Sequence, residues 1–319
     1  MLIYAGIDEA GYGPMLGPLC VGLSVFKVDD WQEGGHAPDL WEMLAGHVAR
    51  RRKGAGSKVV IADSKKVKLP NNSRRRHPLE LLEQGVLAFL PHDVKTDDEL
   101  FRLTGAAAGD APWYQGDPLP LPVGCDADYL RIKISSMRRA MNKAGVQTAA
   151  MNCLMLPAQK FNTLTRESHS KAAVSFKLVT ELIERVWALY PDLHPRIVVD
   201  RQGGRVRYVG ALRHAFPGAD VEIVAETAEL CRYLLKRRNS ELTLTFAVDS
   251  EDRHFPVALA SMLAKYVREL VMTRFNRYFS AKLPDLKPTA GYVQDARRWL
   301  RDAEQVLGDI DRRILVRNC

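Results

Sequence analysis

Apolar positions near the N-terminus form nearly continuous runs, and later stretches alternate between strand-like and helix-like patterns. Residues 2–7 and 19–28 predict two buried strands, joined by the glycine- and proline-rich stretch AGYGPMLGP. Clean period-two alternation in SELTLTFAV, residues 240–248, predicts a half-buried strand. Other strands are expected in the segments 57–63, 149–157, 196–200 and 219–227.

Helical periodicity is clearest at residues 168–190, where apolar side chains recur every three or four positions, and Ser168 is a candidate N-cap. Helices are also expected around 38–53 and at 128–144, 206–216, 255–276 and 293–308. Strands followed by a β/α alternation predict one α/β domain over residues 1–319, with a mixed central sheet flanked by helices. Residues 67–127 are irregular and rich in Gly and Pro, so we interpret them as an insertion.

The composition is that of an ordinary globular protein, with 46% hydrophobic and 26% charged residues. A net charge of +8 and a pI near 9.2 favour a polyanionic partner, nucleic acid first. Five cysteines without a CxxC pair fit neither a zinc ribbon nor a disulfide framework. The sequence shows no signal peptide and no apolar run long enough to span a membrane, so a cytoplasmic location is expected.

Acidic residues stand at the ends of three predicted elements. Asp8 and Glu9 follow the first strand, Asp200 follows RIVV, and an acidic group precedes the long helix: Asp249, Glu251 and Asp252. Catalytic groups concentrate where the strands of open α/β sheets end. Gathered carboxylates repel one another unless a cation neutralises them, and a histidine-free oxygen set favours Mg²⁺ or Mn²⁺. A helix cap or a turn is the alternative for any single acid, although the adjacent pair Asp8–Glu9 is harder to explain in this way.

Five ordered blocks of the sequence resemble the type 2 ribonucleases H, the ribonuclease HII family. GIDEAGYGPMLGP resembles its opening motif, and ADSKK its Asp-Ser-Lys-Lys segment. IVVD is similar to the strand that carries its third catalytic Asp, and EDRHFPVALASMLAK to the stretch with its fourth. AGYVQ resembles the Gly-Tyr segment near the end of the catalytic core.

This resemblance implies a ribonuclease H-like fold and a metal-dependent endonuclease. Such an enzyme hydrolyses RNA in RNA·DNA hybrids, including ribonucleotides embedded in DNA, by two-metal catalysis that leaves 5′-phosphate ends. The catalytic and metal-binding carboxylates carried over are Asp8, Glu9, Asp200 and Asp252. Asp252 has the family's spacing to the proline of the block, whereas counting back from the serine of the same block selects Glu251, and Asp249 is a third choice.

Substrate contacts are also implied by the resemblance. The residues carried over are Gly11, Tyr12, Gly13, Ser64, Lys65, Lys66 and Tyr292. Tyr12 departs from the family's Gly-Arg-Gly turn, and a phenol cannot make the bidentate contact of a guanidinium. A preference for single ribonucleotides is therefore in question, while Tyr292 matches the tyrosine that packs against the sugar. The protein is expected to bind nucleic acid, to avoid membranes and to be monomeric.

Three alternatives remain. The first is a ribonuclease H-fold nuclease with another nucleic-acid substrate, because specificity lies in the altered turn rather than in the acids. The second is a non-catalytic nucleic-acid-binding relative, which the retained acids disfavour. The third is an actin-like or sugar-kinase ATPase, which usually needs two related domains that this sequence does not show. A dinucleotide-binding loop does not fit, because GYGPMLG lacks the GxGxxG spacing and follows two acids.

Overall fold

A seven-stranded mixed sheet forms the centre of the protein in a computed structural model, which describes all residues except 33, 202–204, 309, 311 and 319. The strands lie in the order β5-β2-β1-β6-β9-β8-β7. Their bounds are β1 Leu2–Ala10, β2 Leu19–Val28, β5 Val146–Leu156, β6 Arg196–Asp200, β7 Asp220–Glu226, β8 Leu230–Arg237 and β9 Ser240–Ala247. β6 runs parallel to β1 and β9, whereas the β1–β2, β2–β5, β8–β9 and β7–β8 pairs are antiparallel. This sheet confirms the predicted α/β class.

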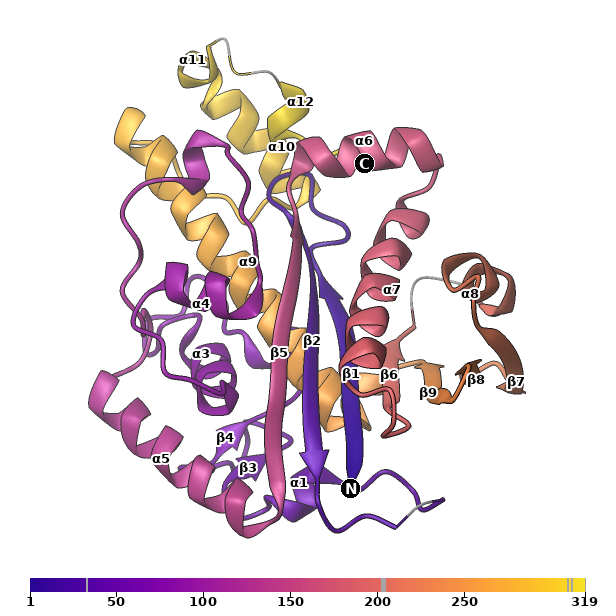
Figure 1. The fold of residues 1–319 in the computed structure, drawn as a ribbon. Helices are drawn as coiled ribbons and strands as arrows, with labels where there is room; N and C mark the ends of the chain where they lie inside the picture. The colour runs from indigo at the N-terminus through magenta and orange to yellow at the C-terminus, as the bar shows by residue number, and fades with distance from the viewer. Residues whose placement is uncertain (33, 202–204, 309, 311, 319) are drawn as a thin grey trace.

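Helices cover both faces of the sheet. The long helix α9 (Phe255–Lys282) crosses behind the strands in Figure 1 and packs with α3 (Glu80–Phe89) and α5 (Ala127–Lys143) in one apolar core. A second core lies on the opposite face beneath α7 (Lys171–Leu189) and α8 (Val209–Ala215). The remaining helices are α1 Leu40–Met43, α2 Ser64–Val67, α4 Asp97–Thr104, η1 Pro112–Tyr114, α6 Ala158–Ser168, η2 Ser250–Asp252, α10 Val293–Asp302, α11 Glu304–Leu307 and α12 Arg312–Leu315.

Two glycines bring α9 unusually close to the sheet. A Cβ atom on Gly6 would lie 2.1 Å from the backbone nitrogen of Val257, and one on Gly22 would lie 2.2 Å from the carbonyl oxygen of Ala260. The Ser24 hydroxyl donates to the carbonyl oxygen of Pro256 at 2.7 Å, which fixes the first turn of α9 against β2. The missing side chains thus set the distance between helix and strands.

Strand β1 sends alternate side chains to opposite faces, as strand geometry requires. Leu2 and Tyr4 belong to the core beneath α9, whereas Ile3, Ala5 and Ile7 belong to the core beneath α7. Consecutive acids at the end of this strand therefore point to opposite faces of the sheet.

The predicted insertion, residues 67–127, contains α3, α4 and η1 and contributes to the core beneath α9. The fully buried carboxylate of Glu83 accepts hydrogen bonds from the backbone nitrogens of Val123, Gly124 and Cys125 at 2.6–3.0 Å. The Tyr266 hydroxyl on α9 donates to the same carboxylate at 2.6 Å. One buried charge therefore ties the insertion to the central helix. Whether the chain forms one domain remains a prediction.

Several element boundaries differ from the prediction. The segment 38–53 contains only the short α1 and the strand β3 (Val48–Ala49), which pairs with β4 (Val59–Val60). The helix expected at 168–190 starts later, with Ser170 as its N-cap, and the helix expected at 293–308 forms as α10 and α11. α6 and β8 were not predicted, and the glycine turn expected at 202–204 lies outside the described residues.

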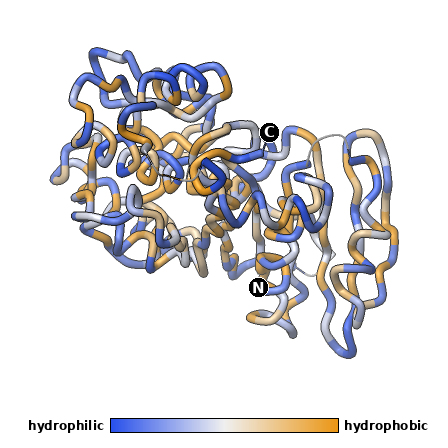
Figure 2. Tube along the Cα trace, turned by 90° about the horizontal axis from the view of Figure 1, so that it is seen from above, coloured by the Kyte–Doolittle hydropathy of each residue, from blue (hydrophilic) through white to orange (hydrophobic). Residues whose placement is uncertain are grey.

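Apolar stretches concentrate toward the middle of the trace in Figure 2, and hydrophilic stretches run over much of its periphery. Within the described residues, no helix combines the length and the apolar character that crossing a membrane requires.

Candidate active site

Asp8 and Asp200 lie on two neighbouring parallel strands, Asp200 as the last residue of β6 and Asp8 two residues before the end of β1. The register pairs Ile7 with Val199, so the next residue on each strand carries one of these acids. Burial and the negative charge of Asp200 raise the pKa of Asp8 well above its ordinary value. A hydrogen bond from Ser261 on α9 and another from the Glu9 backbone nitrogen, at 2.7 Å, favour the ionised form and oppose this rise.

Asp200 is held by the turn that precedes α9. The backbone nitrogen of the buried Ser250 donates to Asp200 Oδ1 at 3.2 Å, and the Ser250 hydroxyl donates to the same oxygen at 2.9 Å. A rigid turn therefore fixes this carboxylate and brings the start of η2 beside it.

Glu251 and Asp252 differ sharply in their surroundings. Burial and the nearby Asp200 raise the pKa of Glu251 to about 7, and its Oε2 is buried without a hydrogen-bond partner among the described residues. Asp252 instead lies half-exposed, and both its oxygens accept hydrogen bonds from Lys66 Nζ at 2.7 Å. Of these two acids, Glu251 is the one that faces Asp200.

Glu9 lies toward the opposite face, where the Ser175 hydroxyl of α7 donates to its Oε2. Burial and the charge of Glu9 together raise the pKa of Tyr12. Glu9 therefore stands between the sheet edge and the glycine turn, which we define as residues 11–17.

A further acid, Asp63, lies beside this group. Its side chain is buried, with 8% exposed, and as the N-cap of α2 it accepts a hydrogen bond from the Lys65 backbone nitrogen at 3.0 Å. Its negative charge also contributes to the raised pKa of Glu251. Its position one residue before Ser64 in the ADSKK block is a signal that could have identified it from the sequence.

The serine and lysines of that block lie on α2. Ser64 is buried, with its Oγ 3.0 Å from Ser261 Oγ, so α2 and the Asp8 side of α9 are in contact. Lys65 is exposed, and Lys66 is bound to Asp252, which raises its pKa. The block therefore brings two cationic side chains to the margin of the acidic group.

The glycine turn packs against the segment that carries Tyr292. The backbone nitrogens of Met15 and Leu16 donate to the carbonyl oxygen of Gly291 at 2.8 and 3.1 Å. Tyr12 and Tyr292 are 40% and 52% exposed, so both rings are accessible to a bound molecule.

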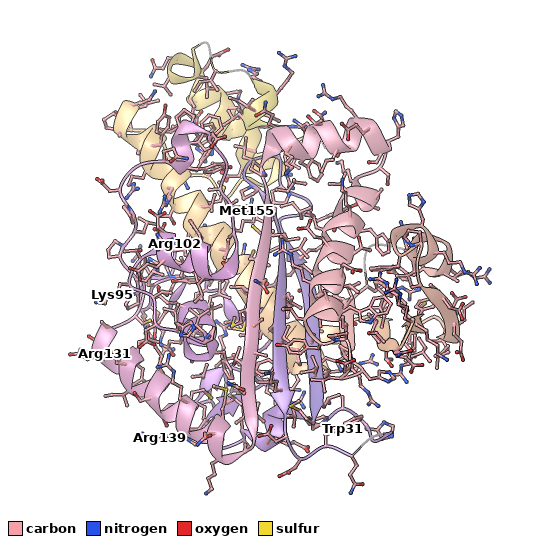
Figure 3. All side chains as sticks on the ribbon, in the orientation of Figure 1. Trp31, Lys95, Arg102, Arg131, Arg139 and Met155 are labelled. Atoms are coloured by element: carbon pink, nitrogen blue, oxygen red, sulfur yellow. The ribbon has the colours of Figure 1, made fainter. Side chains whose placement is uncertain are left out.

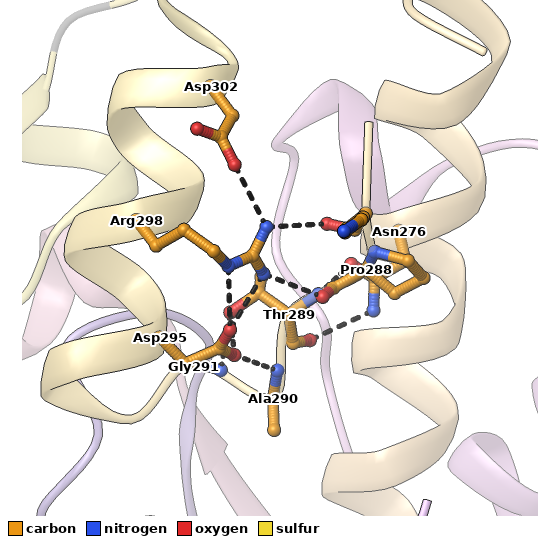
Figure 4. Close-up of polar contacts among 9 residues, drawn as sticks. Asn276, Pro288, Thr289, Ala290, Gly291, Asp295, Arg298 and Asp302 are labelled. Atoms are coloured by element: carbon orange, nitrogen blue, oxygen red, sulfur yellow. Dashed lines mark hydrogen bonds and ion pairs between the residues drawn. The ribbon is translucent and has the colours of Figure 1, made fainter. Parts of the chain in front are cut away.

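A polar network fixes the Tyr292 segment from behind (Figure 4). Asp295 Oδ2 accepts hydrogen bonds from the Thr289 hydroxyl at 2.6 Å and from the Ala290 backbone nitrogen at 2.9 Å. The Arg298 guanidinium donates to Asp295 Oδ1 at 2.7 Å and to the Pro288 carbonyl oxygen at 2.9 Å. The segment is thus rigid immediately before its exposed tyrosine.

Basic residues that are distant in sequence line one cavity of about 830 Å³. It lies between the β3–β4 connection, α3 and the N-terminal half of α5, and its cationic side chains are Arg52, Lys53, Lys58, Arg76 and Lys133. Glu80 is the acidic residue in its lining. Arg131 and Arg139 project from the outer side of α5 (Figure 3). Basic residues of the stretches 50–53 and 74–76 therefore line the same cavity.

Within the described part of the chain, no three His, Cys, Asp or Glu side chains are placed so as to hold a metal ion. Instead, the acids interact in pairs, Asp8 with Asp200 and Asp200 with Glu251. Carboxylate oxygens are the donors that Mg²⁺ and Mn²⁺ prefer, and the buried, unbonded Oε2 of Glu251 is an oxygen for which a cation would be a partner. The donor chemistry therefore fits a divalent ion.

The mixed sheet with helices on both faces makes this an α/β protein, as predicted. No family model matches the sequence, and no curated protein matches it. Solved structures that resemble it include ribonuclease HII of Archaeoglobus fulgidus, from a complex with PCNA. The two sequences are 14% identical, and the superposition has a TM-score of 0.43 and covers 98% of this chain and 93% of the other.

Two further structures extend this comparison. Ribonuclease H2 of Pyrococcus horikoshii OT3 is 15% identical, with a TM-score of 0.39 over 98% of this chain and 92% of that one. Bst-RNase HIII in complex with Mn²⁺ is 14% identical, with a TM-score of 0.40 over 99% of this chain and 66% of that one.

Proposed function

We propose that this protein is a metal-dependent endonuclease of the type 2 ribonuclease H family that cleaves the RNA strand of RNA·DNA hybrids. One observation carries the proposal: Asp8 on β1 and Glu251 on η2 both interact with Asp200 at the end of β6, so acids from three distant segments meet there. Such buried acids destabilise one another unless a cation joins them, which makes a purely structural role costly.

Asp8, Asp200 and Glu251 would hold two Mg²⁺ or Mn²⁺ ions, and Glu9 would complete their ligands from the opposite face. When bound, such ions lower the pKa of an attacking water and stabilise the leaving oxygen of a phosphodiester. The protein's own part is to fix the carboxylates: Ser250 orients Asp200, and Ser261 supports the ionised form of Asp8.

The fourth carboxylate in this proposal is Glu251 rather than Asp252. Both oxygens of Asp252 are already bound to Lys66, and the pair is half-exposed. In this arrangement Asp252 serves to position Lys66, whose ammonium group would contact substrate phosphate together with Lys65.

The glycine turn and Tyr292 would face the ribose side of the duplex. One side of this ribose-facing surface would consist of Gly11, Tyr12 and Gly13. The exposed ring of Tyr292 would form the other side, from the neighbouring segment. Aromatic side chains stack on nucleotides, and hydroxyl contacts distinguish RNA from DNA. Ser64 takes a supporting role, because it is buried against α9.

The basic cavity supports a nucleic-acid partner. Its cationic side chains come from three separate elements, and one acid accompanies them. Clusters of this kind neutralise backbone phosphates and make binding strongly salt-dependent. A monomeric state and a cytoplasmic location remain predictions.

Cleavage assays with Mg²⁺ or Mn²⁺ test the proposal on a uniform RNA·DNA hybrid, a DNA duplex with one ribonucleotide, and an all-DNA duplex. We expect cleavage of RNA-containing substrates with 5′-phosphate products. We also expect Asp8→Asn and Glu251→Gln to lose at least about 10³-fold in kcat, and Asp252→Asn to lose less than about 10-fold. If neither RNA-containing substrate is cut, the enzymatic proposal fails. If Asp252→Asn is the more damaging variant, the choice of Glu251 is wrong.

A second candidate is a nuclease of the same fold that acts on another nucleic acid. The observation that favours it is Tyr12, which leaves the turn without the guanidinium expected at this position. Cleavage of branched or single-stranded DNA in the same assay, with RNA·DNA hybrids left intact, would select this candidate.

A further inference from the structure

Three segments that are far apart in the sequence join at the glycine turn. The turn contacts the Tyr292 segment through Gly291, and it also pairs with residues 315–318, which we call the C-terminal segment. The backbone nitrogen of Arg317 donates to the Met15 carbonyl oxygen at 2.8 Å, and Leu16 and Val316 form an antiparallel bridge. The C-terminal segment is therefore a structural part of the candidate substrate site.

The Arg317 side chain lies beneath the turn and is 1% exposed. Its Nε donates to the carbonyl oxygen of Pro14 at 3.0 Å, and its Nη2 donates to the carbonyl oxygens of Gly11, Tyr12 and Pro14. A single planar guanidinium thus gathers three carbonyl groups of the turn on its inner side. The ammonium group of a lysine is a single compact donor, so it cannot bind these three carbonyl groups in the same planar arrangement.

A second buried arginine, Arg268 of α9, holds the other end of the turn. Its Nη2 donates to the carbonyl oxygens of Leu16 at 2.9 Å and Ala290 at 3.2 Å. A Cβ atom on Gly11, whose φ is +88°, would lie 2.6 Å from Arg268 Nε. Gly11 therefore both adopts a left-handed conformation and leaves room for this guanidinium.

The C-terminal segment is itself anchored by Asn162 on α6. Asn162 Nδ2 donates to the carbonyl oxygens of Val316 at 2.8 Å and Arg313 at 3.0 Å, and its Oδ1 accepts the Asn318 backbone N–H at 2.8 Å. All three bonds go to residues near the C-terminus and none of them goes to the turn. Asn162 can therefore be changed to release Arg317 without altering the turn itself.

We propose that the C-terminal segment acts through Arg317 to set the shape of the glycine turn, and thereby the affinity for the ribose side of a nucleic-acid substrate. Arg317 is a positioning residue in this view, because it contacts the backbone of the turn and not the reacting atoms. The substrate class rests on the proposed function, whereas the control of the turn's conformation does not.

The test compares Arg317→Met, Arg317→Lys and Asn162→Ala with a matched control, Arg312→Met. Arg312 lies three residues before the C-terminal segment, at the start of α12, with an exposed side chain. Hydrogen exchange of the backbone amides in residues 11–17 reports the shape of the turn without any need for activity. We expect faster exchange there by about 10-fold or more in the three test variants, and no change in the control.

Kinetics on a DNA duplex with one ribonucleotide separate positioning from general destabilisation. We expect KM to rise about 10-fold or more while kcat changes by less than about 3-fold, because the carboxylates stay in place. Arg317→Lys is expected to resemble Arg317→Met. If Arg317→Met fails to fold, Asn162→Ala decides the same question.

Unchanged exchange at the turn, or equal losses in KM and kcat on every substrate, would overturn the inference. If the wild-type protein cuts no RNA-containing substrate, the proposed function fails, and the exchange measurement still decides whether Arg317 shapes the turn.

Discussion

Replacing Gly22 by Ala tests whether the contact between α9 and the sheet controls the site. The new Cβ would lie 2.2 Å from the carbonyl oxygen of Ala260 and 3.2 Å from the backbone nitrogen of Ala264. Carbon–oxygen contacts in proteins rarely fall below about 3.3 Å, so the helix must move outward by about 1 Å. Ser261 follows Ala260 directly and moves with it.

The expected loss of stability is about 1–3 kcal/mol, the usual range for an overpacked core. For a chain of this size, each kcal/mol lowers Tm by roughly 2–4 °C, so a decrease of about 2–12 °C is expected by differential scanning calorimetry. Displacement of catalytic groups by about 1 Å reduces rates by about 10²-fold, so kcat on an RNA·DNA hybrid is expected to fall by this order.

Gly46→Ala is the matched control, because a Cβ at Gly46 meets no atom within 4 Å. Its Tm and kcat should remain those of the wild-type protein. A Gly22→Ala variant with unchanged Tm would refute the packing argument. A variant with lowered Tm and full activity would refute the link between the position of α9 and the chemistry.

Three other predictions follow from buried or clustered charges. Glu83→Gln should lower the free energy of unfolding, measured by chemical denaturation, by about 2–4 kcal/mol, because an amide cannot accept all the hydrogen bonds of the carboxylate. Its control is Glu42→Gln at an exposed position, which should change the free energy of unfolding by less than about 0.5 kcal/mol. Arg76→Gln should reduce the slope of log Kd against log salt by about 1 for a hybrid duplex, and Arg213→Gln on α8 should leave it unchanged. Arg268→Met should lower Tm by several degrees, because the buried carbonyl oxygens of Leu16 and Ala290 lose their donor; an unchanged Tm would contradict this.

The sequence predicted best the features that depend on local pattern. Strands β1 and β2, the strand ending at Asp200 and the long helix α9 all lie where apolar runs or helical periodicity place them. Asp200 ends its strand as predicted, whereas the expectation that Asp8 and Glu9 follow the first strand is wrong, because β1 continues to Ala10.

What the sequence did not predict depends on contacts between distant residues. Nothing near Glu83 indicates that its carboxylate accepts three backbone N–H groups some 40 positions away. The same is true of Arg317, which meets Gly11 more than 300 positions away. Asp252 and Glu251 are neighbours with similar chemistry, so spacing alone could not show that Lys66 binds one and Asp200 approaches the other.

The Tyr4 hydroxyl lies 2.7 Å from His254 Nδ1, although 250 positions separate the two residues. The contact joins β1 to the N-cap residue of α9, so the candidate site forms only when the chain between these two elements has folded back on itself. Closing so long a loop costs conformational entropy, and folding rates fall as contacts of high sequence separation come to dominate a fold. A chain truncated before β6 would hold the acids of β1 without Asp200 and Glu251, so the acidic group of the candidate site would be incomplete in it.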